Sequence, residues 1–160
     1  MKTKTILFIA MILIAGITVT SCNKTEDPGT PAGSNGTMTL KYAGTAWSAS
    51  LSVQAVNTNG VLSVTGSDSN AKQGALNINN INGTGTYKVG PNGTDPGNML
   101  RWTEGLGQDQ SYMANSVIGT GTITVDKLTA TEVSGTFSFT GFNTAQTNKS
   151  ITEGAFSAKF

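Results

Sequence analysis

The side chains that could carry out acid–base chemistry in this chain are carboxylates, because the sequence contains no histidine. The absence of histidine excludes Ser-His and Cys-His nucleophilic pairs and histidine-based metal sites. Two carboxylates held close together could hydrolyse a glycosidic bond. The candidates are Asp68, Glu104, Asp109, Asp126, Glu132 and Glu153. Several lie near expected turns and none has the apolar surroundings that raise a pKa, so solvated surface charges are the favoured interpretation.

Aromatic side chains and one acidic loop are the remaining candidates for binding. The aromatic residues that could stack on a sugar ring or line a ligand pocket are Trp47, Trp102, Tyr87 and Tyr112. Packing in the core or at its rim is the alternative, and it is favoured for the tryptophans because aromatic residues dominate small β cores. The loop around Asp95 has too few acidic residues for a calcium site and is expected to be a turn. We therefore predict no metal site and no cofactor.

Cys22 is the only cysteine of the chain and follows Val19, Thr20 and Ser21. This order is similar to a bacterial lipobox, in which signal peptidase II cuts before the cysteine and a diacylglyceryl group is attached through a thioether. A lone thiol would otherwise be unusual in an exported protein. We therefore predict that Cys22 is lipidated, and two or more acyl chains make such an anchor stable.

The segment before Cys22 has the layout of a secretory signal, with basic residues at Lys2 and Lys4 and an apolar run over residues 6–19. A transmembrane helix needs about 20 apolar residues, and this run is shorter and is interrupted at Gly16 and Thr18. Residues 1–21 are thus predicted to be a lipoprotein signal peptide with a signal helix. A plain signal peptide and a retained membrane anchor are the less favoured alternatives.

Residues 22–36 are predicted to be a flexible tether, because Pro, Gly and polar residues dominate them and no apolar periodicity is present. Asn23 stands where an Asp would indicate inner-membrane retention in enteric bacteria. Residues 23–27 (NKTED) are similar to the acidic export signal of Bacteroidota surface lipoproteins. We therefore expect an outer-membrane protein whose lipid lies in the membrane and whose domain is exposed at the cell surface.

Residues 37–160 are predicted to form one β-domain, because apolar and polar residues alternate with period two. The odd-numbered residues from 47 to 55 are apolar and predict one strand. Asn59 and Gly60 then predict a type I′ hairpin turn, which places Ala55 opposite Val64. The apolar faces of the two strands match in this register.

A second hairpin is predicted near the C-terminus, where Ile123 and Phe139 belong to strands whose apolar residues all have odd numbers. One register puts Gly121 opposite Phe137, where the ring would cover the glycine. A last strand ends at Phe160, and weaker strands are expected near 38–42, 74–80, 85–89, 98–104 and 110–114. The predicted fold is an all-β antiparallel barrel or sandwich of about nine to ten strands, with a calycin- or lipocalin-like barrel favoured.

Four pieces of the sequence carry a family resemblance: residues 44–47 (GTAW), 85–87 (GTY), 119–125 (GTGTITV) and 133–140 (VSGTFSFT). In this order they resemble an uncharacterised family of short Bacteroidota lipoproteins with a domain of unknown function. The resemblance covers most of the chain after Cys22. It implies a lipobox, a polar tether and a β-rich domain, and it implies no particular activity.

The charges of the chain nearly cancel, with 10 Lys and Arg against 9 Asp and Glu, so nucleic acid is not an expected partner. We predict a monomeric, lipid-anchored, non-catalytic envelope protein whose β-domain binds a small apolar ligand or has a structural role. A glycan-binding or adhesion module with exposed Trp or Tyr is the alternative. A carboxylate-dependent glycosidase is the least favoured interpretation.

Overall fold

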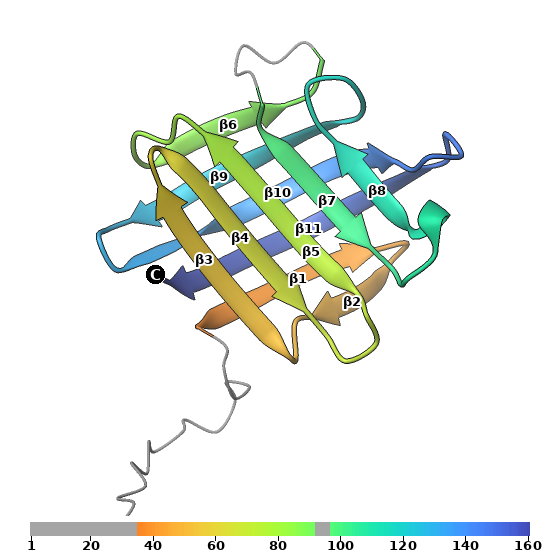
Figure 1. Cartoon of the computed structure of the whole chain (residues 1–160), viewed down its shortest axis with the longest axis horizontal. Helices are drawn as coiled ribbons and strands as arrows, with labels where there is room; N and C mark the ends of the chain where they lie inside the picture. Colours follow the sequence, from red (N-terminus) through yellow and green to blue (C-terminus); the bar gives the residue numbers. More distant parts are fainter. Residues whose placement is uncertain (1–34, 92–96) are drawn as a thin grey trace, which may run out of the picture.

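The computed structural model describes residues 35–91 and 97–160 (Figure 1). Cys22, the predicted signal peptide, residues 22–34 of the predicted tether and Asp95 lie outside the described residues. The elements are β1 (Gly36–Tyr42), β2 (Thr45–Ser48), β3 (Ser52–Thr58), β4 (Val61–Ser67), β5 (Gln73–Asn79), β6 (Gly85–Val89), β7 (Met99–Thr103), the 3-10 helix η1 (Gln108–Gln110), β8 (Ser111–Ala114), β9 (Thr120–Leu128), β10 (Glu132–Phe142) and β11 (Asn148–Lys159). In this part of the chain, no helix has the length and apolar character needed to span a membrane.

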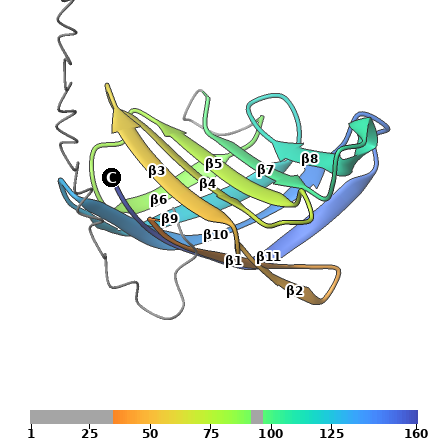
Figure 2. The ribbon, with the colours of Figure 1, turned by 60° about the horizontal axis from the view of Figure 1, so that its bottom comes forward.

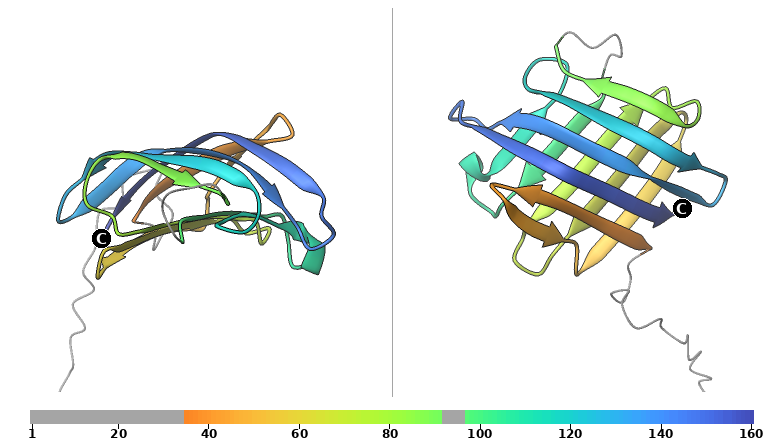
Figure 3. Two further views of the ribbon diagram at one scale, coloured as in Figure 1. Left: turned by 90° about the horizontal axis from the view of Figure 1, so that it is seen from above. Right: turned by 180° about the vertical axis from the view of Figure 1, so that it is seen from behind.

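The strands form one 11-stranded antiparallel sheet in the order β2-β1-β11-β10-β8-β7-β5-β4-β3, and β9 pairs with β10 and β6. The long strand β10 links the two halves of the sheet, because it pairs with β9 and β11 and, at Phe142, with Met113 of β8. The sheet curls into a half-barrel with two facing layers (Figures 2 and 3). The prediction of an all-β antiparallel fold is confirmed. Within residues 35–91 and 97–160, no ladder joins β2 to β3 to close the barrel.

The space between the two layers is filled by apolar side chains. The largest fully buried ones are Trp102, Met38, Leu40, Leu62, Leu76, Ile78, Leu100, Ile123, Ile151, Val53, Val64 and Val125. They come from both layers and belong to one core cluster. Burying one such aliphatic side chain stabilises the fold by about 1.5–3 kcal/mol. The interior of the half-barrel is therefore a packed core.

The predicted β3–β4 hairpin is confirmed in its register, since Ala55 lies opposite Val64. Asn59 and Gly60 have φ angles of 52° and 78°. A type I′ turn requires positive φ at both of its central residues, which Asn and Gly adopt at little cost. The local sequence therefore determines this turn.

The strand predicted over residues 47–55 is wrong, because the chain turns a corner between β2 and β3. Trp47 lies in β2, which pairs with β1, whereas Ala55 lies in β3, which pairs with β4. Leu51 lies at the corner and is 54% exposed. The alternating pattern continues across the corner, so the pattern alone cannot locate it. This division raises the strand number to eleven.

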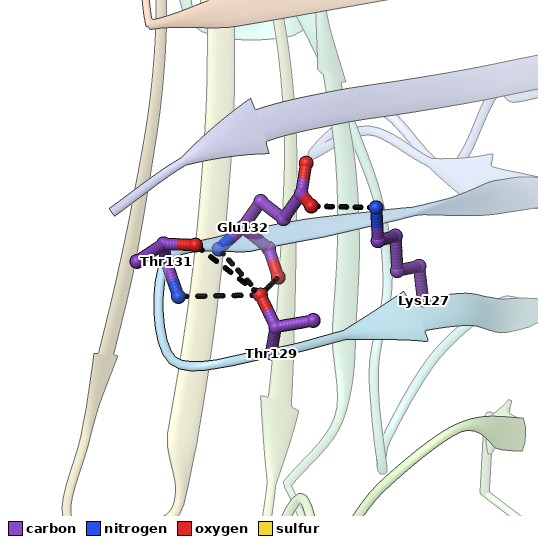
Figure 4. Close-up of polar contacts among 4 residues, drawn as sticks. All are labelled: Lys127, Thr129, Thr131 and Glu132. Atoms are coloured by element: carbon purple, nitrogen blue, oxygen red, sulfur yellow. Dashed lines mark hydrogen bonds and ion pairs between the residues drawn. The ribbon is translucent and has the colours of Figure 1, made fainter.

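The β9–β10 hairpin has the predicted buried face but another register: Gly121 lies opposite Phe139, and Phe137 lies opposite Ile123. The turn is fixed by Thr129, whose Oγ1 accepts hydrogen bonds from the backbone N–H groups of the two residues at 131 and 132 (Figure 4). The register then shifts by one residue between Ser134 and Gly135. Because of this irregularity, the inward-facing residue of β9 changes from the odd-numbered Val125 to the even-numbered Leu128, which lies opposite Val133, while Lys127 is exposed.

Candidate functional site

Four connections meet at one end of the half-barrel, at the right and lower right of Figure 1: the β1–β2 turn and the β4–β5, β7–β8 and β10–β11 loops. We call this region the loop end. Lys72 of the β4–β5 loop donates a hydrogen bond from Nζ to Tyr42 Oη at 2.7 Å. Asn143 of the β10–β11 loop donates from Nδ2 to the backbone oxygen of Asp109 at 2.7 Å. These bonds connect segments that are far apart in the sequence.

An aromatic cluster, made of Tyr42, Trp47, Trp102 and Tyr112, lies beneath the loop end. Trp102 is fully buried at its centre, 4.9 Å from the Trp47 ring in an edge-to-face arrangement and 5.0 Å from the Tyr42 ring. Tyr112 is its cross-strand neighbour on β8. Each such aromatic pair adds about 0.5–1.5 kcal/mol beyond the area that it buries. The cluster therefore gives the loop end a rigid base.

The ammonium group of Lys149 bridges the aromatic cluster and a carboxylate. Its Nζ lies 4.6 Å from the centre of the Tyr112 ring and 5.8 Å from that of Tyr42, within cation–π range. It also forms an ion pair of 2.5 Å with Glu104 Oε2. The other oxygen of Glu104 accepts a hydrogen bond of 3.2 Å from Trp102 Nε1. Both carboxylate oxygens of Glu104 are thus engaged within the protein.

Asp68 is a buried structural carboxylate, so its predicted role as a solvated surface charge is wrong. It is 8% exposed, and Trp47 Nε1 donates to its Oδ2 at 2.8 Å. The backbone N–H groups of Asn70 and Lys72 donate to its Oδ1 at 2.8 and 3.0 Å. Burial alone would raise the pKa of Asp68, but these hydrogen bonds and the nearby Lys72 charge lower it below its ordinary value. Asp68 holds the β4–β5 loop against the aromatic cluster.

An open depression of about 610 Å³ lies at the loop end. Its lining residues are Tyr42, Lys72, Glu104, Asp109, Gln110, Tyr112, Asn143, Ala145 and Thr147. They combine two aromatic rings, opposite charges, carboxamides and a hydroxyl. Ligand sites of this size commonly pair an apolar surface with a few placed polar groups. This depression is the candidate functional site.

The structure brings together three of the four aromatic residues that the sequence singled out. Trp47, Trp102 and Tyr112 belong to the aromatic cluster, and each is at most 8% exposed. Tyr87 lies on β6, where its hydroxyl donates a hydrogen bond to the backbone oxygen of Gly83 at 2.8 Å. Only Tyr112 of the four lines the depression, so the tryptophans support the site from below.

The acidic residues that the sequence singled out are divided between several places. Glu104 and Asp109 line the depression, while Asp68 is buried beneath the loop end. The other three lie on the hairpin and strands of the facing layer: Asp126, Glu132 and Glu153. In the two described ranges, no group of three or more His, Cys, Asp or Glu side chains is placed to hold a metal ion.

Sequence reasoning missed Tyr42, Lys72 and Lys149, which shape the site as much as the residues it proposed. Tyr42 directly precedes the β1–β2 turn, and each lysine stands next to a loop or at its end. A turn signal beside a polar or aromatic residue is common, so it does not mark a site. Lys72 and Tyr42 are 30 residues apart in the sequence, and only the sheet order brings them together.

Comparison with known proteins places the β-domain in a family. Neither the curated proteins nor the solved structures gave a match. One family model, described as a domain of unknown function, matches residues 34–158, which span the described sheet almost completely. The predicted membership of an uncharacterised family is confirmed, while the lipoprotein character and the Bacteroidota origin stay predictions. The chain belongs to the DUF6252 family, a family of domains of unknown function.

Proposed function

We propose that the protein is a lipid-anchored, non-catalytic envelope protein whose β-domain binds a small polar ligand at the loop end. The observation that carries this proposal is the depression in which Tyr42 and Tyr112 lie beside charged groups and carboxamides. Loops on a rigid scaffold are where binding residues usually gather. Here the scaffold is the sheet and the aromatic cluster beneath the loops.

The position of the anchor supports a ligand site that faces away from the membrane. Strand β1 runs from Gly36, which pairs with Ala158, to Tyr42, which pairs with Ile151 at the loop end. A strand of this length spans about 20 Å. The predicted anchor at Cys22 precedes β1, so it is joined to the end of the domain opposite the depression.

The packed interior favours a surface site over the internal apolar ligand expected of a lipocalin-like barrel. Trp102, Leu100 and Ile123 are 0% exposed and occupy the space between the layers. A small barrel either fills its interior with side chains or holds a ligand there. We therefore propose a polar ligand at the loop end in place of an apolar one inside.

The carboxylates of the depression favour binding over hydrolysis. A glycosidase needs one carboxylic acid that can reach the glycosidic oxygen and a second carboxylate that can act on the sugar ring. Both oxygens of Glu104 are engaged, by Trp102 and by Lys149. Asp109 Oδ1 accepts a hydrogen bond from the Thr144 hydroxyl. These carboxylates therefore stabilise the loops.

Metabolic labelling tests the anchor. Cells that express the full chain would be grown with an alkyne analogue of palmitate, and the purified protein would be probed for the alkyne. We expect labelling of the wild type and none of Cys22→Ser, and protease added to intact cells should degrade the wild type. Labelling that persists in Cys22→Ser, or a domain protected from protease on intact cells, would contradict the proposed anchorage or surface location.

A thermal-shift screen of polar small molecules against the full chain in detergent tests the binding site. We expect a hit that raises the Tm of the wild type and loses its effect in Gln110→Ala, since Gln110 is exposed in the depression. Lys88→Ala is the matched control, because Lys88 lies on β6 beside another depression. Hits that act equally on both variants, or only apolar hits, would refute a polar site at the loop end.

A further inference from the structure

The cations around the depression are paired within the protein, and Asp109, which lines it without an ion pair in the described part of the chain, accepts a hydrogen bond from the Thr144 hydroxyl. Lys149 is paired with Glu104, and Lys72 donates to Tyr42 and stands near the buried Asp68 carboxylate. An anionic ligand would have to break one of these pairs or lie beside them without a partner, which costs free energy. The depression therefore disfavours an anion, and its uncharged lining groups favour a neutral polar ligand.

The polar groups left free in the depression include a carboxamide and an aliphatic hydroxyl. The Asn143 side chain is already used, since its Oδ1 accepts a hydrogen bond of 2.8 Å from the backbone N–H of Thr147. Among the described residues, the side chains of Gln110 and Thr147 have no hydrogen-bond partner, and both residues are exposed. Gln110 supplies two donors and one acceptor, and Thr147 supplies one donor and two lone pairs.

The apolar part of the lining consists of aromatic rings. Tyr42 is half-buried and Tyr112 is mostly buried, and both border the depression. A pyranose ring presents C–H groups on its faces and hydroxyl groups along its edge. The C–H faces of such a ring can pack on the Tyr rings, and its hydroxyl groups can form hydrogen bonds with the free carboxamide and hydroxyl.

We infer that the loop end binds a neutral saccharide, which contacts the Tyr42 and Tyr112 rings and forms hydrogen bonds with Gln110 and Thr147. This inference rests on the proposed function and names the ligand class of the same site. Another depression, of about 510 Å³, is bordered by hydroxyl-bearing residues on β9, β10 and β11 and by Lys88. The one aromatic residue that borders it, Phe139, is 4% exposed, so this depression serves as the comparison region.

Tryptophan fluorescence is the natural readout, since the two tryptophans of the chain both belong to the aromatic cluster. The full chain in detergent would be titrated with maltohexaose, cellohexaose, chitohexaose and, as an anionic probe, hexagalacturonate. We expect saturable binding of at least one neutral hexasaccharide, with a Kd that changes less than twofold between low and high salt. Charge-dependent binding would weaken markedly over the same range.

Variants at exposed positions test whether the saccharide binds at the loop end. Gln110→Ala and Thr147→Ala should each weaken binding of the neutral saccharide by about tenfold, the effect of about one lost hydrogen bond. Lys88→Ala and Thr122→Ala, beside the comparison depression, should leave the Kd unchanged. Tyr112→Ala would remove a buried ring of the aromatic cluster, so the variants at exposed positions carry the test.

The inference is overturned if no neutral hexasaccharide binds, or if hexagalacturonate alone binds in a salt-dependent way. It is also overturned if neutral saccharides bind with the same Kd to Gln110→Ala and Thr147→Ala. A polar non-saccharide that requires Gln110 in the thermal-shift screen would leave the proposed function standing and would refute only the saccharide class.

Discussion

The loop end and the hairpin turns on the opposite side of the half-barrel are stabilised by different kinds of contact. In the β9–β10 turn, Thr129 bonds to backbone groups two and three residues further along the chain. At the loop end, the bond from Trp47 to Asp68 spans 21 residues and the bond from Lys72 to Tyr42 spans 30. A turn can therefore form from its own sequence, whereas the loop end exists only in the assembled sheet.

The two regions also differ in solvent exposure, which determines how much each hydrogen bond contributes. Thr129 is exposed, so water replaces any bond that it loses, whereas Asp68 is buried and its donors would remain unpaired. An unsatisfied buried donor costs about 1–3 kcal/mol, while an exposed one costs little. The contacts that make the depression are therefore also among the most sensitive contacts of the fold.

Among substitutions in these two regions, Asp68→Ala should lower the free energy of unfolding most. The substitution leaves the Trp47 indole N–H and the backbone N–H groups of Asn70 and Lys72 without their acceptor. We expect a loss of about 3–5 kcal/mol in the free energy of unfolding. Urea denaturation followed by tryptophan fluorescence measures it. Asp126→Ala, at an exposed position of β9, is the matched control, and an equal loss in both variants would contradict the special role of Asp68.

The lowered pKa of Asp68 predicts that the stability of the fold depends on pH. The pKa of Asp68 is lower in the folded protein than its ordinary value, so the unfolded chain takes up this proton first as the pH falls. The stabilisation is fully present above about pH 5, starts to decline near the ordinary Asp pKa of about 3.9 and is lost as the pH falls through the folded pKa. The difference in unfolding free energy between wild type and Asp68→Asn should therefore shrink below about pH 4. A difference that stays constant from pH 7 to pH 3 would exclude this linkage.

The sequence could predict the hairpin turns, which depend on local contacts, but not the loop end, which depends on contacts between distant segments. The Asn59-Gly60 turn and the β3–β4 register follow from two adjacent residues and the alternation on either side. The loop end depends on Tyr42 meeting Lys72 and on Lys149 meeting Glu104, and these meetings follow from the order of β1, β11 and β10 in the sheet. A single sequence contains no local signal for that order.

An alternating pattern can continue through a corner or a register shift, which explains why the strand over residues 47–55 and the β9–β10 register differ from their predictions. The apolar pattern over residues 47–55 continues through the corner at Leu51, because both β2 and β3 face the same core. In the β9–β10 hairpin, the irregularity between Ser134 and Gly135 shifts the register by one residue, so that Leu128 of β9 faces the core in place of Lys127. Periodicity therefore identifies the faces of strands better than their bounds or their partners.

Gly60→Ala tests how much the backbone conformation of the β3–β4 turn contributes to stability. Gly60 has a φ of 78°, and a Cβ there would meet no atom closer than 3.9 Å, so the cost is backbone strain alone. We expect a loss of about 1–2 kcal/mol in unfolding free energy. Gly44→Ala, at a φ of 77° in the β1–β2 turn, should cost about the same. A much larger loss at Gly44 would show that even the turns of the loop end depend on distant contacts.

Thr129→Ala should have a smaller effect, because it removes an exposed side-chain acceptor from the β9–β10 turn. By analogy with Ser and Thr caps of helices, we expect a loss of about 1 kcal/mol. Thr129→Ser keeps the hydroxyl and should retain nearly the wild-type stability. Equilibrium denaturation of both variants measures the difference, and an equal loss in Thr129→Ser would show that the methyl group matters instead.

Lys127→Ala should have the smallest effect. Its ammonium lies 2.5 Å from Glu132 Oε1 across the β9–β10 hairpin, but both side chains are well exposed, at 54% and 37% (Figure 4). Such a pair contributes less than about 0.5 kcal/mol because solvent screens it. The related pair at the loop end, Lys149 with Glu104, is only 21% and 22% exposed and lies against an aromatic ring. Lys149→Ala should therefore destabilise the protein clearly more than Lys127→Ala in the same urea titration. Equal losses of stability in the two variants would mean that burial does not strengthen the ion pair at the loop end, and would contradict the proposed difference between the loop end and the hairpin turns.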